Sequence, residues 1–286
     1  MAINGGGSMR ARDVIALLQE MMPCDPSLVK VDGLVLGDEL APVSRIGVAF
    51  VASVPVLEAA REAGVDFLIT HEGAFFRHEG DVAGEDPVLS QKRSLLRRLG
   101  ISVYRLHDRP HRASPDWVAE GLAEALGWSG AIRERMAEPC DVPIVAWAQA
   151  MTFDDVVARV CARLGVRGLR VSGRVPVARR IALLPGYRGT GDLVARVFRE
   201  SNADVILAGE GPEWEAMEYV RDACAMGLPR AVVWLGHQLS ESPGMRRIAK
   251  ELAAHCRVPV VFLDQESAFA WQDGTSQSSA TARQDT

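Results

Sequence analysis

The amino-acid sequence predicts an α/β fold made of two similar lobes with mostly parallel sheets. Short apolar runs alternate with helical patterns along the chain, which is typical of βα units around a parallel sheet. One strand–helix–strand unit with a Glu-Gly ending occurs twice. The 286 residues are 48% hydrophobic and 24% charged, which is the composition of a folded chain with a substantial core.

The first lobe is expected over residues 9–138. It begins with a helix over residues 12–22, because the apolar side chains of that segment recur on one helical face. Buried strands then alternate with helices, with the strands at residues 46–51, 67–70 and 101–106 and the helices at residues 55–63, 88–99 and 116–126.

The second lobe is expected over residues 179–272. Its strands are predicted at residues 181–184, 205–208, 232–235 and 258–263, and its helices at residues 192–199, 214–226 and 244–254. An intervening segment, residues 139–178, has its own pattern of strand (142–147), helix (153–164) and strand (169–172). The sequence leaves open whether this segment adds strands to a lobe or forms a small cap.

The two ends of the chain have a different character. Residues 1–8 precede a second methionine and are interpreted as a tag or linker. Residues 273–286 are rich in Ser, Thr, Gln and Asp without apolar periodicity, so a disordered tail is expected there.

The internal repeat is the most specific pattern in the chain. Arg45-Ile-Gly-Val-Ala-Phe and Val65-Asp-Phe-Leu-Ile-Thr-His-Glu-Gly match Arg180-Ile-Ala-Leu-Leu-Pro and Ala203-Asp-Val-Ile-Leu-Ala-Gly-Glu-Gly. In each half a further strand ends in a histidine, followed four residues later by another candidate ligand: His107 and His111 in the first half, His237 and Glu241 in the second. Two βαβαβ lobes related by a pseudo-twofold axis should result.

Charge and hydropathy exclude several classes of partner. The net charge of −5 and the pI near 5.7 argue against nucleic acid, which requires a basic surface. No apolar run approaches the roughly 18 residues of a membrane span. The five cysteines are scattered and never form a CxxC pair, which favours reduced thiols and a cytoplasmic location.

Candidate ligands gather just beyond the predicted strand ends, where parallel α/β folds bind ligands. Four of the six histidines are among them; the whole set is His71, Glu72, His107, Asp108, His111, Glu210, His237 and Glu241. Imidazole and carboxylate without cysteine select a divalent transition metal such as Zn, Mn or Fe. Three neutral imidazoles with two carboxylates carry about −2, which suits one ion or, with hydroxide, two.

Each of these residues alone also has a structural interpretation. Glu72 or Glu210 can favour a nearby helix N-terminus through the helix dipole. His78 and His255 have no counterpart in the other half and are interpreted as structural. The glycine-rich segment 186–191 fits a tight βα turn better than a phosphate cradle, because its fingerprint is incomplete.

Four segments of the chain carry a specific set of motifs: Val31-Asp-Gly-Leu-Val-Leu-Gly37, Gly64-Val-Asp-Phe-Leu-Ile-Thr-His-Glu-Gly-Ala-Phe-Phe76, the stretch 107–127 and Gly236-His-Gln-Leu-Ser-Glu241. With these motifs the chain resembles, from about residue 12 to residue 264, the NGG-interacting-factor-like proteins, also known as GTP cyclohydrolase type 2-like or dinuclear-metal-centre hexameric proteins. The resemblance implies two interlinked lobes and a toroidal homohexamer with metal pairs facing an inner cavity.

Two positions depart from the family pattern. The family has two adjacent histidines where this chain has His71-Glu72, and an aspartate where it has His111. The exchange is reciprocal and keeps three histidines and two acids, although a short bridging aspartate is lost. A metal centre with its own substrate is therefore expected.

The resemblance and the residues together predict a metal-dependent hydrolase of a small molecule, cleaving a non-peptide C–N bond of cyclic amide or amidine type. The predicted metal ligands are His71, Glu72, His111, His237 and Glu241, with His107 and Glu72 as catalytic groups. The alternatives are a non-catalytic, metal-binding oligomeric scaffold or regulatory protein, and a nucleotide-binding module at residues 186–191.

Overall fold

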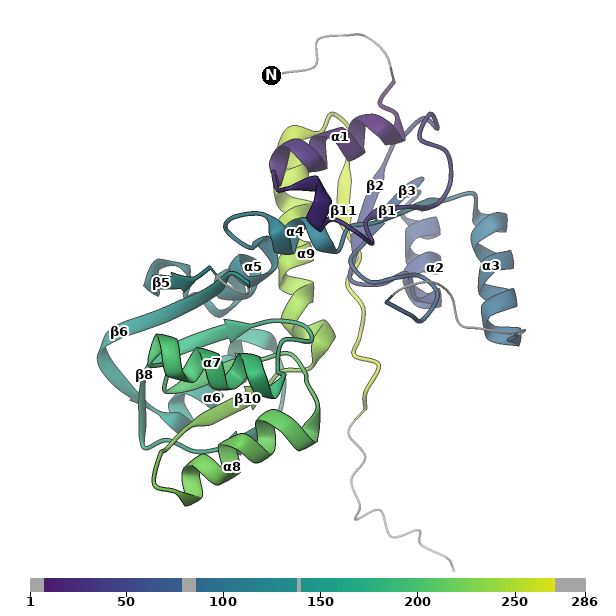
Figure 1. Ribbon diagram of the computed structural model, residues 1–286. Coiled ribbons are helices and arrows are strands. Elements are labelled where there is room, and N and C mark those ends of the chain that lie inside the picture. The colour runs from purple at the N-terminus through teal and green to yellow at the C-terminus, as the bar shows by residue number, and fades with distance from the viewer. Residues whose placement is uncertain (1–7, 79–85, 138–139, 271–286) are drawn as a thin grey trace, which may run out of the picture.

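The chain forms two sheets, each covered by helices on both faces (Figure 1). The computed structural model describes residues 8–78, 86–137 and 140–270. The strand orders are β1-β4-β3-β2-β11 in the first sheet and β5-β6-β8-β9-β10-β7 in the second. The predicted α/β class with two similar lobes is confirmed. The predicted tag and tail, apart from Ser8, lie outside the described residues.

The first sheet has a parallel centre of fully buried strands. Its strands are β1 (Gly33–Leu36), β2 (Ile46–Ala49), β3 (Phe67–Thr70), β4 (Ser102–Arg105) and β11 (Val260–Phe262), of which only β1 runs antiparallel. Alternate side chains enter opposite cores, as the two-residue period of a strand requires. One face packs against α1 (Ala11–Met21), and the other against α2 (Val54–Glu62) and α3 (Pro87–Leu99).

The second sheet has the same parallel centre with antiparallel strands at its edges. Its strands are β5 (Ile132–Met136), β6 (Val142–Thr152), β7 (Arg170–Gly173), β8 (Val177–Leu184), β9 (Val205–Ala208) and β10 (Ala231–Trp234). One face packs against α6 (Phe153–Leu164), and the other against α7 (Gly191–Ser201) and α8 (Glu218–Ala225). The segment left open by the sequence therefore adds β6, α6 and β7 to this lobe.

The lobes exchange a helix, which makes them interlinked as the resemblance implies. Helix α5 (Trp117–Leu126) follows the first sheet in the chain but contributes its apolar face to the core of the second. Helix α9 (His237–His255) follows the second sheet, and its C-terminal half packs on the first, where β11 pairs with β2. In Figure 1, α9 extends along both lobes. Sheet pairing thus divides the chain differently from the predicted boundaries of 9–138 and 179–272.

The two exchanged helices cross at a pair of glycines. A Cβ added to Gly121 of α5 would overlap the backbone of Gly244 in α9, and one added to Gly244 would lie 2.6 Å from the Cα of Val118. Only glycines permit helix backbones to approach this closely. The small residues at this crossing therefore hold the two lobes together.

Helix α9 starts seven residues before the predicted helix 244–254. Pro243 lies inside it, so the helix continues through a residue that lacks a backbone N–H. Short helices complete the fold: η1 (Pro26–Leu28), α4 (Asp108–Arg112), η2 (Ser129–Ala131) and the π-helical turn η3 (Glu213–Met217). In the described residues, no helix has both the length and the apolar character needed to cross a membrane.

Candidate metal centre

The candidate ligands come from both lobes and meet where the lobes join. His71 and Glu72 directly follow β3, while His107 follows β4 and precedes α4, which carries His111. His237 is the first residue of α9, and Glu241 lies one turn later. Because residues four apart share a helix face, the early start of α9 places His237 and Glu241 on the same side.

All four histidines are oriented in the same way. In each ring Nδ1 faces an outer oxygen atom, so that in the neutral imidazole Nδ1 is the donor and Nε2 carries the lone pair. The partners are the Leu106 carbonyl for His71 at 3.1 Å, Asp108 Oδ1 for His107 at 3.0 Å, Asp116 Oδ2 for His111 at 3.0 Å and Glu210 Oε1 for His237 at 2.9 Å.

The four Nε2 atoms converge on two carboxylates. Nε2 of His71, His111 and His237 lies 3.1, 3.4 and 3.0 Å from an oxygen of Glu241. Nε2 of His107 and His237 lies 3.6 and 3.3 Å from Oε1 of Glu72. Atoms bound to one transition-metal ion at about 2.0–2.2 Å lie about 3–3.5 Å from each other. The spacing therefore fits ligands of a shared ion.

Two of these atoms are buried, and neither meets hydrogen-bond geometry with any partner among the described residues. Nε2 of His71 and Oε2 of Glu241 face each other with side-chain exposures of 0% and 2%. A neutral imidazole nitrogen and a carboxylate oxygen are both lone-pair donors, so their contact is repulsive without a cation or a proton. Three groups of His and Glu atoms near this point could hold a metal ion, and one of them joins His71, Glu72 and Glu241.

The surrounding charges keep both carboxylates ionised. Burial would raise the pKa of Glu72, but the hydrogen bond with His237 and the charge of His107 lower it to about 2. Burial opposes ionisation of Glu241 as well, yet the nearby imidazoles of His71, His111 and His237 hold its pKa well below the ordinary value. Both carboxylates are therefore ionised at neutral pH.

The imidazoles differ in their affinity for protons. Burial would lower the pKa of His237, but the carboxylates of Glu241 and Glu72 beside its Nε2 raise it to about 11. Asp116 likewise outweighs burial at His111 and raises its pKa to about 9. At His107 burial dominates and lowers the pKa to about 4, although Asp108 opposes this shift. His107 is therefore neutral at pH 7, whereas the sequence had suggested titration near neutrality.

Several supporting residues were not recognised from the sequence. Asp32 accepts hydrogen bonds from the backbone N–H groups of His107 (2.8 Å), Asp108 (2.6 Å) and Arg109 (3.1 Å), so it orders the turn that carries His107. Buried Arg105 donates to Glu72 Oε2 at 3.2 Å, which leaves Oε1 facing the imidazoles. Asp32 belongs to the sequence motif at residues 31–37. Its role in ordering the turn at His107 is visible only from the contact between these two distant segments.

Arg188 and Asp116 connect the second lobe to His111. Arg188 Nη2 lies 2.7 Å from Asp116 Oδ2, the same oxygen that faces Nδ1 of His111. The other oxygen of Asp116 accepts from the N–H groups of Val118 and Ala119 at the start of α5. One buried carboxylate therefore caps a helix, binds a guanidinium and orients a histidine.

The glycine-rich turn at residues 186–191 serves the centre rather than a phosphate. Gly186 has φ +69°, and a Cβ there would overlap Oε1 of Glu241. At the other end of the turn, the N–H of Gly191 donates to Glu215 Oε2 at 2.9 Å. The protein's own carboxylate thus occupies the N-terminus of α7, which does not support the nucleotide-module alternative.

His78 lies closer to the centre than its structural interpretation implied. Its ring centroid is 4.6 Å from that of His107, and its Nδ1 is 3.2 Å from Arg105 Nη2. It also joins Glu72 and His107 in one of the groups that could hold a metal ion. The repeat gave no signal for it. His255, in contrast, is exposed and turned to the backbone oxygen of Glu251.

Comparisons with known proteins agree with this architecture. A protein of Clostridium perfringens (strain 13 / Type A) described as a "GTP cyclohydrolase 1 type 2 homolog" is 24% identical over 267 residues, covering 91% of this chain and 97% of the relative. The solved structure of "protein ybgI, unknown function" has a TM-score of 0.74 at 22% identity, covering 91% of this chain and 99% of its own. A Bacillus cereus "protein related to NIF3" has a TM-score of 0.74 at 15% identity, covering 93% and 100%.

The family follows from the sequence model that matches. That model, described as "Duf34/NIF3 (NGG1p interacting factor 3)", matches residues 9–268, which is nearly the whole chain. It confirms the resemblance drawn from the motifs around His71, His107 and His237. The chain belongs to the DUF34/NIF3 family.

Proposed function

We propose that this protein is a metal-dependent hydrolase that uses water to cleave a C–N bond of cyclic amide or amidine type in a small molecule. The observation that carries the proposal is the common orientation of four histidines, whose Nε2 atoms converge on Glu72 and Glu241. The name of the C. perfringens relative, a cyclohydrolase homologue, supports the substrate class.

The metal is a divalent transition ion, Zn, Mn or Fe, bound as one or two ions per subunit. His71, His111, His237, Glu72 and Glu241 would hold it, because together they offer imidazole nitrogens and ionised carboxylates without a thiolate. The outer acceptors on each Nδ1 raise the basicity of the ligating Nε2 atoms.

When bound, the ion would supply Lewis acidity toward water and toward a carbonyl oxygen or imine nitrogen, which makes the attached carbon more electrophilic. Glu72 and His107 are the residues that can move protons at the open side, since their side chains are 19% and 15% exposed while Glu241 is enclosed. His107 is neutral and can accept a proton on Nε2, and Asp108 beside Nδ1 stabilises the resulting charge. The ionised Glu72 accepts a hydrogen bond on Oε1.

The experiment is metal analysis of the purified protein followed by a hydrolase screen on cyclic amides and amidines, with and without chelator. We expect bound metal, chelator-sensitive activity, and loss of both in the double variant His237→Ala/Glu241→Ala. His255→Ala is the matched control, because it removes an exposed histidine remote in sequence from the ligands. Undiminished metal in the double variant would refute the site.

The same metal-loaded protein can distinguish the enzyme hypothesis from the alternative of a non-catalytic scaffold. A catalytic site keeps a coordination position for exchangeable water, whereas a structural site is closed by protein ligands. We expect enhanced water-proton relaxation in the Mn-loaded protein, and a relaxation rate equal to that of the double variant would contradict catalysis. Light scattering tests the homohexamer, which we infer from the family resemblance alone.

A further inference from the structure

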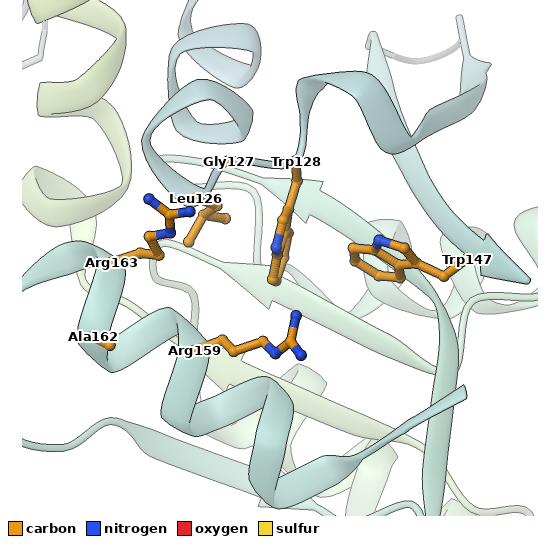
Figure 2. A pocket seen from close by; sticks show the side chains of 7 residues that line it. All are labelled: Leu126, Gly127, Trp128, Trp147, Arg159, Ala162 and Arg163. Carbon is orange, nitrogen blue, oxygen red and sulfur yellow. The ribbon is translucent and has the colours of Figure 1, made fainter. Parts of the chain in front are cut away.

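The second lobe contains a pocket unrelated to the metal ligands. It has a volume of about 340 Å³ and lies between the end of α5, the strand β6 and the helix α6. Figure 2 shows its seven lining residues, Leu126, Gly127, Trp128, Trp147, Arg159, Ala162 and Arg163. The volume is within the range of small-molecule sites, about 300–1,000 Å³.

Two indoles form the aromatic wall of this pocket. The rings of Trp128 and Trp147 are 5.2 Å apart and nearly perpendicular, at 82°. Trp128 is 5% exposed and belongs to the core, which fixes its ring, while Trp147 packs against the same core from the edge. In Figure 2 the Trp128 ring extends into the space beside Arg163, above Arg159. A rigid aromatic surface at a cavity favours a flat ring as its ligand.

The polar side-chain groups of this pocket are all donors. Arg159 and Arg163 lie four residues apart on α6, so their guanidiniums project from one helix face. Within the described residues, neither guanidinium has an ion-pair or hydrogen-bond partner. The only other polar side-chain groups in the lining are the indole N–H groups. Two unpaired cations without an acidic neighbour in the lining, in a protein of net charge −5, select an anion.

A neighbouring hollow extends the positive region. It has a volume of about 540 Å³, shares Arg163 with the first pocket, and is also lined by Lys250 and by two ion pairs, Arg246–Asp264 and Arg247–Glu124. Arg163 therefore lies between the aromatic pocket and a hollow whose lining carries a net positive charge. A ligand seated on the indoles would place its charged end at this arginine.

We propose that this pocket binds a planar aromatic anion, with its ring against the partly buried Trp147 and the small exposed part of Trp128, and its phosphate or carboxylate on Arg159 and Arg163. The site is separate from the proposed metal centre and does not require bound metal. A nucleoside monophosphate and an aromatic carboxylate share this chemistry, and the two are distinguished by titrating each.

The test is quenching of tryptophan fluorescence by AMP and by 2-naphthoate, with adenosine and 2-naphthol as uncharged partners, in chelator-treated protein. We expect at least one anion to bind with a Kd below about 1 mM, and its uncharged partner to bind at least tenfold more weakly. AMP binding alone would identify a phosphate ester, and naphthoate binding alone a carboxylate.

The variant Arg159→Gln/Arg163→Gln should weaken that binding at least tenfold without changing the melting temperature, because both side chains are exposed. Arg167→Gln, an exposed arginine that does not line the pocket, is the control and should leave the Kd unchanged. Absence of binding by both anions, equal binding of the uncharged partners, or an unchanged Kd in the double variant would overturn the proposal. Binding that persists in Glu241→Gln shows independence from the metal centre, and its loss there would overturn the separate site.

Discussion

Nε2 of His71 lies 3.1 Å from Oε2 of Glu241, and both atoms are buried without a hydrogen bond to any residue that the structure describes. The Leu106 carbonyl holds the N–H of the ring on the opposite side, at Nδ1. The two residues come from different parts of the chain, the end of β3 and the first turns of α9. A fold that buries two facing lone-pair donors is stabilised by a cation between them.

Metal binding should release protons. In the metal-free protein, His237 and His111 have pKa values raised to about 11 and about 9, so both are charged at pH 7.5, whereas His107 is neutral. Coordination requires neutral imidazoles. We therefore expect about two protons released per site at pH 7.5, measured by calorimetry in buffers of different ionisation enthalpy. Release of no proton would contradict coordination by these two histidines.

The pH dependence has a defined sign. Metal affinity should rise with pH, with log K increasing by about two per pH unit below pH 9 and about one above it, where His111 has already lost its proton. The metal-free fold shows the opposite trend. The protonated His111 contributes stability below its ordinary pKa of 6.5, and this contribution is lost as pH rises through about 9.

The exchanged pair Glu72 and His111 should behave as a coupled pair. Glu72 contacts His107 and His237, while His111 contacts Glu241. Glu72→His and His111→Asp should each weaken metal binding, and the double variant should recover much of the affinity. The expected coupling energy is about 0.5–3 kcal/mol. Small effects that simply add in metal titrations would show that the two positions are independent.

Asp116 should act as a positioning residue for His111. Asp116→Asn keeps one oxygen for the helix cap but turns an NH₂ toward Arg188 and Nδ1 of His111, where two donors already point. We expect a loss of metal affinity of roughly 10–100-fold together with a lower melting temperature. Asp25→Asn is the control, because Asp25 also caps a short helix but is exposed. If the two variants bind metal equally well, Asp116 has no such role.

The crossing of α5 and α9 should tolerate no side chain at Gly121. A Cβ there would overlap the backbone of Gly244, so Gly121→Ala should destabilise the protein by about 1–3 kcal/mol in urea unfolding. Gly130→Ala is the matched control, since a Cβ at Gly130 meets nothing within 4 Å, and its effect should stay within about 0.5 kcal/mol. Equal unfolding midpoints would show that the helices can separate without cost.

The central strands were predictable because each is a short apolar run bounded by turns. The runs at 67–70 and 205–208 match β3 and β9 residue for residue. The assignment of β11 to the first sheet was not predictable, because local pattern does not specify which lobe a terminal strand joins. The exchange of α5 and α9 between lobes is also a property of tertiary packing.

At the candidate site, strand-end position and the internal repeat singled out four histidines and Glu241, and the structure brings these side chains together. The supporting shell was less visible, since Asp32, Arg105 and Arg188 act through contacts distant in sequence. His78 was set aside because the repeat offers no counterpart, yet its ring lies against His107. A sequence pattern can locate candidate ligands that lie at one edge of a sheet. The residues that hydrogen-bond to those ligands depend on how the two lobes pack together, which the pattern does not show.

The most direct test of the account is anomalous diffraction from crystals of the protein soaked in Zn²⁺. We predict one or two strong peaks per subunit, with one peak about 2.0–2.1 Å from Nε2 of His71 and bound by Glu241, the residue that faces it. Ligation through Nε2 is required because Nδ1 faces the Leu106 carbonyl. A well-ordered His71–Glu241 contact without an anomalous peak would contradict the metal centre.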